Sequence, residues 1–343
     1  MEEDVNLRKK SELSLGGGIK LPRGFAMPFR LSRSTAGPGA GSASAVFAFG
    51  RYRVKKGVSY DSGEFELHEG GGRLYLTRGG EPFLDEVTIQ PVVFHCPEQA
   101  FFNLDQRCMF SCAFCASPRL DKGTVKDLSP EAIVSMVRGA MDGGEVRSVS
   151  LTSGVVDGID QTVERMAAAA AAVRREFPGM PIGVEPYVSR REHLEALREA
   201  GASEAKLNAE AARRDIFEKV CPDLDYGGVF EMLEAAVEIF GRGNVTSNVI
   251  YGLGESDEDL AEVAERLCAM GVIPTLRALR RNAYNGESLD AAIGSVPPVD
   301  TERALRAAGM LKSALERHGL NPRGCRTMCL ECGCCDLVPF RDL

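Results

Sequence analysis

The amino-acid sequence predicts an α/β protein: a partial (βα)6 barrel of the TIM type, with a small N-terminal β-rich unit and a C-terminal cysteine-rich extension. Three observations lead to this prediction. From about residue 98, apolar strand-like segments alternate with helical ones at intervals of ~25–30 residues, the size of βα repeats. Before that point, short segments alternate apolar and polar residues, as strands do. Near the end, five of the 11 cysteines fall within residues 325–335. We therefore divide the chain into residues 1–95, 96–320 and 321–343.

The N-terminal unit consists of a loop-like part and a β-rich part. Residues 1–42 are rich in Gly, Ser, Pro and Arg, so we expect linker or loop there. The segments "GEFELHE" (63–69) and "RLYLTR" (73–78) are joined by "GGG", which predicts a β-hairpin.

The barrel elements follow in order. A strand at 100–104 precedes a helix over 128–144, in which Ser129 is the cap and Pro130 takes the first helical position. Ser256 and Asp259 form a capping-box-like pair at the start of a later helix. The remaining strands are predicted at 146–154, 181–188, 204–210, 244–255 and 272–280, and the remaining helices at 159–179, 191–201, 226–241, 256–271 and 301–319.

A barrel explains this alternation better than a dinucleotide-binding sheet does. No Gly-x-Gly-x-x-Gly motif follows the first strand. In a barrel, the reactive groups lie at the carboxyl ends of the strands. Polar residues gather at those predicted ends, at 103–105, 152–153, 185, 208–210, 248 and 277–282.

Charge and cysteine content restrict the classes of function. The formal net charge of −8 argues against non-specific nucleic-acid binding, which depends on cationic neutralisation of phosphates. The N-terminus lacks the apolar core of a secretory signal, and no apolar run reaches ~18 residues. We therefore expect a cytoplasmic protein that binds no membrane. Cysteines in that reducing compartment favour metal ligation over disulfides.

The stretch "CMFSCAFC" places Cys108, Cys112 and Cys115 within eight residues. Thiolates prefer soft metals, with zinc and iron–sulfur clusters the leading candidates. A closed zinc site needs four ligands, and the only nearby supply is His95 or Cys96. Three thiolates instead suit a cubane that keeps one iron open to a group outside the protein. The scattered Cys96, Cys221 and Cys268 are expected to be small apolar core residues.

The C-x-x-x-C-x-x-C spacing, with Phe114 just before the third cysteine and the whole motif just after the first barrel strand, resembles the radical S-adenosylmethionine superfamily. The resemblance implies a [4Fe–4S] cluster whose open iron is chelated by S-adenosylmethionine. It further implies reductive cleavage of that cofactor to a 5′-deoxyadenosyl radical, which abstracts hydrogen from an unactivated C–H bond. A low-potential electron donor of the ferredoxin or flavodoxin type would then be a partner.

Further segments match the family in part. "LTSG" (Thr152, Ser153, Gly154) stands where the family's Gly-Gly-Glu binds the methionyl amine, but it has no acid, so backbone carbonyls would accept that amine. In "LNAE", Asn208 and Glu210 resemble the polar pair that contacts the ribose or methionyl group. Arg213 or Arg214 would hold the methionyl carboxylate, and we add Glu185 to the cofactor-binding set.

"NVIYGLGE" resembles the fifth-strand motif G-x-I-x-G-x-x-E. Ile250, Gly252 and Glu255 match it, whereas Asn248 replaces the first glycine. Adenine would pack on Ile250 and Leu253. The alternative is that the glycines only permit a strand-to-helix turn.

The second cysteine group, Cys325, Cys329, Cys332, Cys334 and Cys335, offers four ligands and one spare. We predict an auxiliary iron–sulfur cluster there, of the [4Fe–4S] type, with structural zinc as the alternative. The segment follows the last barrel helix, and we expect it to fold back over the barrel mouth. An auxiliary cluster could donate sulfur, relay electrons or anchor a substrate.

The resemblance is greatest to the biotin-synthase-related branch, which includes lipoyl synthases and an [FeFe]-hydrogenase maturase. Our specific hypothesis is sulfur insertion into a small-molecule or protein-bound acyl substrate, with a possible partner subunit. Arg277, Arg280 and Arg281 are the candidate substrate residues, because a guanidinium suits carboxylate or phosphate. The alternatives are a radical rearrangement or modification without sulfur transfer, and a non-catalytic iron–sulfur carrier. No residue that contacts the reacting atoms can be assigned.

Overall fold

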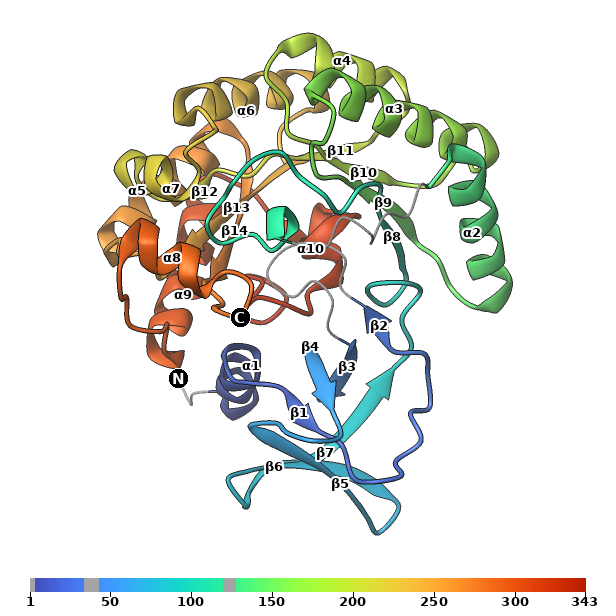
Figure 1. The fold of residues 1–343 in the computed structure, drawn as a ribbon, viewed down its shortest axis with the longest axis vertical. Coiled ribbons are helices and arrows are strands. Elements are labelled where there is room, and N and C mark those ends of the chain that lie inside the picture. The colour runs from blue at the N-terminus through green and yellow to red at the C-terminus, as the bar shows by residue number, and fades with distance from the viewer. Residues whose placement is uncertain (1–3, 34–42, 120–127) are drawn as a thin grey trace.

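The computed structural model describes residues 4–33, 43–119 and 128–343. Figure 1 shows a small β domain beside a larger barrel surrounded by helices, with the C-terminal segment running between the two. The hairpin predicted from "GEFELHE" and "RLYLTR" is present as two antiparallel strands, β5 (Phe65–Gly70) and β6 (Arg73–Arg78).

The N-terminal domain is a closed sheet. Its strands run in the order β2-β3-β4-β1-β5-β6-β7, and an added β3–β7 pairing closes the sheet on itself. Closure leaves β3 to β7 without open edges, and phenylalanines such as Phe47 and Phe65 fill the centre. The remaining bounds are β1 (Ile19–Lys20), β2 (Ser32–Arg33), β3 (Ala43–Phe49), β4 (Tyr52–Ser59) and β7 (Glu81–Gln90).

The expectation of linker or loop over residues 1–42 is wrong for part of that range. Helix α1 (Val5–Leu15) forms there, and the side chain of Asp4 caps it by accepting from the amides of Asn6 and Leu7. Its Leu13 is fully buried in the core of the β domain. The helix is largely polar, so its sequence lacks the apolar periodicity that usually marks an amphipathic helix.

The barrel confirms the predicted partial (βα)6 architecture. Six parallel strands run in the spatial order β8-β9-β10-β11-β13-β14, and a short strand, β12, pairs with the carboxyl end of β13. No pairing joins β8 to β14 among the described residues, so the barrel stays open on one side. The strands are β8 (Gln99–Asn103), β9 (Ser148–Thr152), β10 (Ile182–Glu185), β11 (Glu204–Lys206), β12 (Glu210–Ala211), β13 (Val245–Tyr251) and β14 (Ile273–Ala278).

Helices cover the outside of this sheet (Figure 1). Two predicted starts are confirmed: Ser129 caps α2 with Pro130 in its first turn, and Ser256 and Asp259 form a full capping box on α7. The α-helices are α2 (Pro130–Gly143), α3 (Ile159–Glu176), α4 (Arg191–Glu199), α5 (Arg214–Val220), α6 (Tyr226–Phe240), α7 (Asp257–Met270), α8 (Gly286–Ile293) and α9 (Thr301–Arg317).

The C-terminal segment lies inside the barrel. Helix α10 (Met328–Cys332) sits at the centre of the ring of strands in Figure 1. It contacts Gln99 and Glu204, which begin β8 and β11. The expectation that this segment folds over the barrel mouth is therefore wrong: it fills the amino-terminal half. Hydrogen bonds from the Met328 and Thr327 amides to the Gln99 and Glu204 side chains hold it there.

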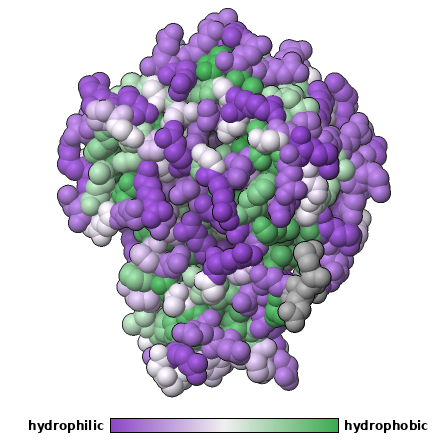
Figure 2. All heavy atoms as spheres, turned by 180° about the vertical axis from the view of Figure 1, so that it is seen from behind, coloured by the Kyte–Doolittle hydropathy of each residue, from purple (hydrophilic) through white to green (hydrophobic). Residues whose placement is uncertain are grey.

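The outer surface is mainly polar. On the face opposite to that of Figure 1, hydrophilic residues predominate and hydrophobic ones form separate patches (Figure 2). Within the described ranges, none of the helices combines the length and the apolar character that a bilayer span requires.

Candidate functional site

The interior of the barrel is lined by polar side chains. Successive side chains of a strand point to opposite faces, and residues paired across parallel strands share a face. Lys206 of β11 and Arg277 of β14 both reach Cys329 inside the barrel, which fixes the inward face. The residues on that face are Gln99, Phe101, Asn103, Ser148, Ser150, Thr152, Gly183, Glu185, Glu204, Lys206, Thr246, Asn248, Ile250, Ile273, Thr275 and Arg277. Barrel interiors are usually filled by branched apolar residues, so this polar lining indicates a site for a polar ligand.

The C-terminal segment occupies the amino-terminal half of the interior. The Glu204 carboxylate accepts from the backbone amides of Arg326 and Thr327 at 2.9 and 3.0 Å. The Gln99 side chain accepts from the Met328 amide at 3.0 Å and donates to its carbonyl at 3.3 Å. A Cβ on Gly183 would lie 2.2 Å from the Thr327 hydroxyl, so only glycine fits there. The buried polar groups of this half are thus used to hold the segment.

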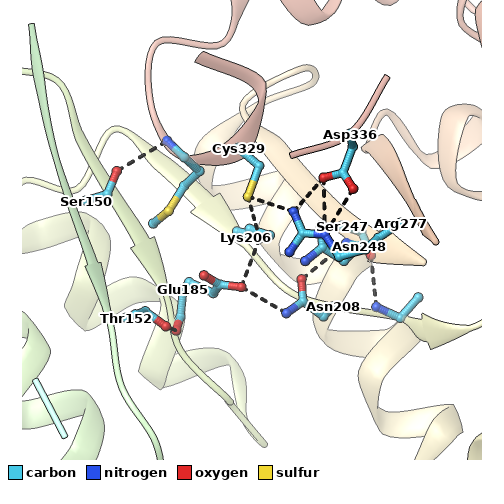
Figure 3. Close-up of polar contacts among 12 residues, drawn as sticks. Ser150, Thr152, Glu185, Lys206, Asn208, Ser247, Asn248, Arg277, Cys329 and Asp336 are labelled. Atoms are coloured by element: carbon cyan, nitrogen blue, oxygen red, sulfur yellow. Dashed lines mark hydrogen bonds and ion pairs between the residues drawn. The ribbon is translucent and has the colours of Figure 1, made fainter. Parts of the chain in front are cut away.

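Above that segment, charged residues form a connected network (Figure 3). Lys206 Nζ lies 3.0 Å from the Glu185 carboxylate and donates to Cys329 Sγ at 3.3 Å. Arg277 also reaches this sulfur, at 3.4 Å, and forms an ion pair of 2.6 Å with Asp336. The network joins β10, β11 and β14 to the C-terminal segment. Glu185, Arg277 and Cys329 were predicted as site residues, whereas Lys206 and Asp336 are revealed only by the tertiary structure.

The network sets the charge states of two acids. Burial alone would raise the pKa of Glu185, but the Lys206 ammonium and the Asn208 amide outweigh it and lower the pKa. Burial, reinforced by the nearby Glu185 carboxylate, raises the pKa of Glu210 to about 7. Glu210 also has a φ of 61°, which is unusual for a residue other than glycine. Near neutral pH this acid can therefore carry or release a proton inside the barrel.

The loop with the first three cysteines is fixed by hydrogen bonds from several elements. The amide and hydroxyl of Ser111 both donate to Asp223, each at 2.6 Å. From α8 and its N-cap, Asn285 donates to the Phe114 carbonyl at 3.0 Å, and Ser288 donates to the Ala113 carbonyl at 2.7 Å. Phe114 itself is buried. The loop follows β8, so Cys108, Cys112 and Cys115 lie at the carboxyl end of the barrel.

Burial affects two of these thiols, Cys108 and Cys115. It raises the pKa of Cys108, and it raises the pKa of Cys115 to about 11. Cys221, expected to be an ordinary core residue, is fully buried and lies against this loop. A hydrogen bond with Cys112 raises the pKa of its thiol. No motif marks Cys221, so only the tertiary structure reveals this contact.

The segment after β9 passes directly beneath the loop. A Cβ on Gly154 would lie 1.9 Å from the Arg107 carbonyl oxygen and 3.3 Å from the Cys108 Cβ. The Gly154 amide donates to the Asp105 carbonyl at 2.8 Å. The neighbouring Thr152 faces inward, whereas the Ser153 hydroxyl donates to the Gly154 carbonyl. This strand end is therefore close enough to Cys108 to contact a group bound there.

In the turn after β13, the carboxylate of Glu255 binds groups of the protein itself. The Glu255 carboxylate accepts from the amides of Gly252 and Leu253 at 2.7 and 2.9 Å, and it forms an ion pair of 2.8 Å with Arg303. Gly252 has a φ of 91°, and a Cβ there would approach Val299 to 2.7 Å. Ile250 points into the barrel, and Asn248 lies two residues before it on the same face.

The arginines predicted to bind cofactor or substrate have other partners. Arg213 forms an ion pair with Asp215 at 2.9 Å and is half exposed, and Arg281 pairs with Asp290. Arg280 donates to the Cys335 carbonyl at 2.9 Å. Only Arg277 of these four points into the barrel, because β14 ends at Ala278, before Arg280 and Arg281.

The later cysteines separate into three groups. Cys325 lies near the start of β13, where its thiol is 3.9 Å from the Gly243 carbonyl. Cys329 belongs to the interior network. Cys332 and Cys334 pack together with Cys96 of the chain preceding β8, and Cys335 follows them in sequence.

In the described parts of the chain, no three His, Cys, Asp or Glu side chains converge closely enough to hold a metal ion as they stand. This applies equally to the motif cysteines and to the later ones. Metal binding at either place therefore requires loss of the thiol protons and rotation of the side chains.

The upper half of the interior nevertheless fits an iron–sulfur cluster with a polar cofactor. Three thiols come from one clamped loop, and the Gly154 backbone lies beside the first of them. Asn248 Oδ1 and Thr275 Oγ1 are buried, face inward, and have no hydrogen-bond partner among the described residues. Buried acceptors of this kind usually have a partner, so these two groups indicate space for a ligand with donors.

Comparison with known proteins agrees with this geometry. Residues 103–267 match the family model "Radical SAM superfamily". A biotin synthase of Leptospira biflexa serovar Patoc is 24% identical over 204 residues, which cover 55% of this chain and 57% of that relative. The matched part is thus little more than half of the relative's length.

Two solved structures share the fold. The FeFe-hydrogenase maturase HydG from Carboxydothermus hydrogenoformans aligns with a TM-score of 0.52 at 17% identity, covering 64% of this chain and 51% of that chain. Methylornithine synthase (PylB) aligns with a TM-score of 0.51 at 16% identity, covering 65% of this chain and 69% of that chain.

Proposed function

We propose, from the premise that residues 103–267 form a Radical SAM superfamily domain, that this chain is an enzyme that cleaves S-adenosylmethionine reductively and abstracts hydrogen from an unactivated C–H bond. The observation that carries the proposal is the position of the three-cysteine loop. It lies at the carboxyl end of the barrel, above a polar interior whose Asn248 and Thr275 retain unused hydrogen-bonding capacity. When bound, a [4Fe–4S] cluster with S-adenosylmethionine supplies the 5′-deoxyadenosyl radical.

The residues of this chain would hold and orient those groups. Cys108, Cys112 and Cys115 would bind the cluster. The backbone at Thr152 and Gly154 would accept hydrogen bonds from the cofactor amine, because this segment passes beside Cys108. Asn208, Asn248 and Ile250 line the path from there into the interior.

Glu210 and Glu185 have distinct roles in this proposal. With its pKa raised to about 7, Glu210 can donate or accept a hydrogen bond to a cofactor or substrate hydroxyl. Glu185 stays ionised beside Lys206 and orients the Asn208 amide, which donates to it at 3.0 Å. The charged groups of Arg213 and Glu255 are already paired with Asp215 and Arg303. These two residues would therefore support the binding site by holding their own chain segments in place, without contacting the cofactor through their charges.

The test is anaerobic reconstitution with iron and sulfide, followed by reduction in the presence of S-adenosylmethionine. Wild-type protein should release 5′-deoxyadenosine, and changing Cys108, Cys112 and Cys115 to alanine should abolish the release. Changing the remote buried Cys268 to alanine is the matched control and should leave it intact. If the wild-type protein bound about four irons at the motif but released no 5′-deoxyadenosine, the proposed cleavage would be refuted.

For the outcome of the reaction we propose sulfur insertion, supported by the cysteine-rich segment that enters the same barrel from its other end. The substrate would be an acyl compound, free or protein-bound, with its reacting carbon between the first loop and Cys329. Loss of auxiliary sulfide during turnover, measured as acid-labile sulfide per product formed, tests this idea. Sulfide that stays constant over several turnovers would exclude it.

One observation favours radical modification without sulfur transfer as the second candidate. Cys332 and Cys334 are buried against Cys96 and Val46, whereas the Cys329 and Asp336 side chains of the same segment contact Arg277 inside the barrel. A centre bound by those cysteines would be shielded from a substrate. In that case the product should contain no added sulfur, which mass spectrometry of the product distinguishes directly.

A further inference from the structure

Cys96 contacts the C-terminal cysteines across the boundary between the two domains. It packs with Cys332, Cys334 and Val46 in one buried cluster, in which Cys96 is 1% exposed and Cys334 is fully buried. The Cys332 thiol hydrogen-bonds with both Cys96 and Cys334. Cys96 precedes Cys332 by 236 positions in the sequence, so the meeting of these two cysteines is a property of the tertiary structure alone.

A buried lysine lies beside this cluster. Lys55 of β4 is only 7% exposed. Its ammonium donates to the Ser32 hydroxyl at 3.0 Å and contacts His95 at both Nδ1 and the carbonyl. These partners are neutral, and no carboxylate of the described residues forms an ion pair with it. A buried charge is costly without a counter-charge, and the groups that act on Lys55 through their charge are Cys335, Cys96, Cys332 and Cys334.

Other basic residues surround the same cysteines. Arg53, two residues before Lys55 on β4, lies close to Cys332 and Cys334. Arg277 and Arg280 of the barrel domain lie close to Cys335, although Arg277 is also paired with Asp336. Positive charge therefore approaches from both domains. A set of four metal-bound thiolates carries net negative charge, which these side chains would balance.

The backbone fixes the meeting point. The Lys55 amide donates to the Cys334 carbonyl at 2.9 Å, which extends β4 onto the C-terminal segment. Arg53 donates to the Glu331 carbonyl at 3.0 Å. The position of the cysteines thus depends on backbone contacts and does not require a bound group.

We propose that Cys96, Cys332, Cys334 and Cys335 bind a second, four-thiolate metal centre that links the N-terminal β domain to the barrel. This proposal specifies the ligands of the auxiliary cluster that the proposed function includes. It rests on the proposed function only for the identity of the metal. Cys96 replaces Cys325 in the ligand set, because Cys325 lies apart, beside Gly243. Cys329 is held by Lys206 and Arg277 and is not needed.

The chemistry is ligand exchange without oxidation. At present the Cys334 thiol points to the Cys332 carbonyl at 3.2 Å and the Cys96 thiol to the Gln99 carbonyl at 3.9 Å. On binding, each thiol would lose its proton to the medium, rotate about its Cα–Cβ bond and form a bond to the metal. A [4Fe–4S] cluster and a zinc ion both accept four thiolates, so the experiment must distinguish them.

The test uses a chain in which Cys108, Cys112 and Cys115 are all alanine, so that any metal left belongs to the second site. After anaerobic reconstitution we expect about four irons and four sulfides per chain, or about one zinc if zinc is the metal. Adding Cys96→Ala should remove at least nine-tenths of this metal. Adding Cys325→Ala or Cys268→Ala, also buried cysteines, should leave it in place. Retention of the metal in the Cys96→Ala chain, or its loss in the Cys325→Ala chain, would overturn the ligand set.

A second measurement needs no substitution and covers the case in which Cys96→Ala fails to fold. In the metal-loaded wild-type chain, treatment with a thiol-alkylating reagent in urea, where burial alone no longer protects a thiol, followed by peptide mass spectrometry should find Cys96 and Cys332 protected by the metal. Both should become labelled after chelation, whereas labelling of Cys325 should change little. Equal labelling of Cys96 with and without metal would overturn the proposal. Both experiments are independent of 5′-deoxyadenosine release, so a failure here and a failure of the proposed cleavage are distinguishable.

Discussion

The ammonium of Lys206 lies 3.3 Å from the thiol of Cys329, so the end of the fourth barrel strand holds the C-terminal segment inside the barrel. Lys206 is 2% exposed and also pairs with Glu185. One buried cation thus connects the strand ends, where a cofactor would bind, to the segment that carries the later cysteines.

Replacing this lysine should destabilise the protein strongly. Lys206→Met removes one partner of a buried ion pair and leaves the Glu185 carboxylate uncompensated, so we expect a loss of about 3 kcal/mol or more in the free energy of unfolding. Urea denaturation followed by circular dichroism measures it. The double variant Lys206→Met/Glu185→Gln should recover part of the loss. A single variant within about 0.5 kcal/mol of wild type would show that the pair is not important for stability.

Glu210 should make stability depend on pH. Its pKa is about 7 in the folded chain and near 4.5 when unfolded. The stability associated with its protonated form is complete below pH 4.5 and is lost as the pH rises to about 7. Glu210→Gln should therefore be more stable than wild type above pH 7, by at most about 3 kcal/mol, and almost equal to it near pH 4.

Denaturation of both proteins at several pH values, without added cofactor, tests this prediction. The difference between the two should increase between pH 4.5 and 7 and stay constant above that range. A difference that is independent of pH would contradict the raised pKa.

Gly154 should be required for the first cluster. In Gly154→Ala the new Cβ would lie 1.9 Å from the Arg107 carbonyl, so the backbone beside Cys108 must move. We expect a severalfold loss of iron bound at the motif cysteines after reconstitution. Gly139→Ala on α2 is the matched control, because its Cβ would meet nothing within 4 Å and alanine favours a helix interior by about 0.5–1 kcal/mol. Equal iron content in the two variants would show that the close approach has no role in cluster binding.

Glu204 should hold the C-terminal segment at the amino end of the barrel. Glu204→Gln replaces a carboxylate that accepts from two amides and from the Thr327 hydroxyl. Hydrogen bonds to charged groups contribute about 1.5–3 kcal/mol each, so a loss of at least about 2 kcal/mol is expected. Faster proteolytic cleavage within residues 325–343 should accompany it. Unchanged proteolysis together with unchanged stability would mean that other contacts suffice.

Much of the barrel was predictable because its signals are local. The alternation of apolar strands and helices, the Ser129 cap and the Ser256–Asp259 capping box all depend on residues a few positions apart. The spacing of Cys108, Cys112 and Cys115 is equally local, and it predicted a resemblance to the superfamily whose model matches residues 103–267. Helix α1 was missed because its polar sequence is stabilised by one buried leucine and by a cap, neither of which produces a periodic pattern.

The sequence by itself determined the order of the elements, the run of βα units and the presence of two cysteine groups. Only the tertiary structure decided how those groups are used: that the later cysteines enter the barrel from its amino-terminal end, that Cys96 meets Cys332 and Cys334, and that Lys206 and Arg277 converge on Cys329. The physical reason is the separation along the chain of the residues that interact. Helices, caps and metal-binding spacings arise from neighbouring residues, whereas these contacts depend on buried charges and hydrogen bonds that bring distant parts of the chain together, and no local pattern encodes them.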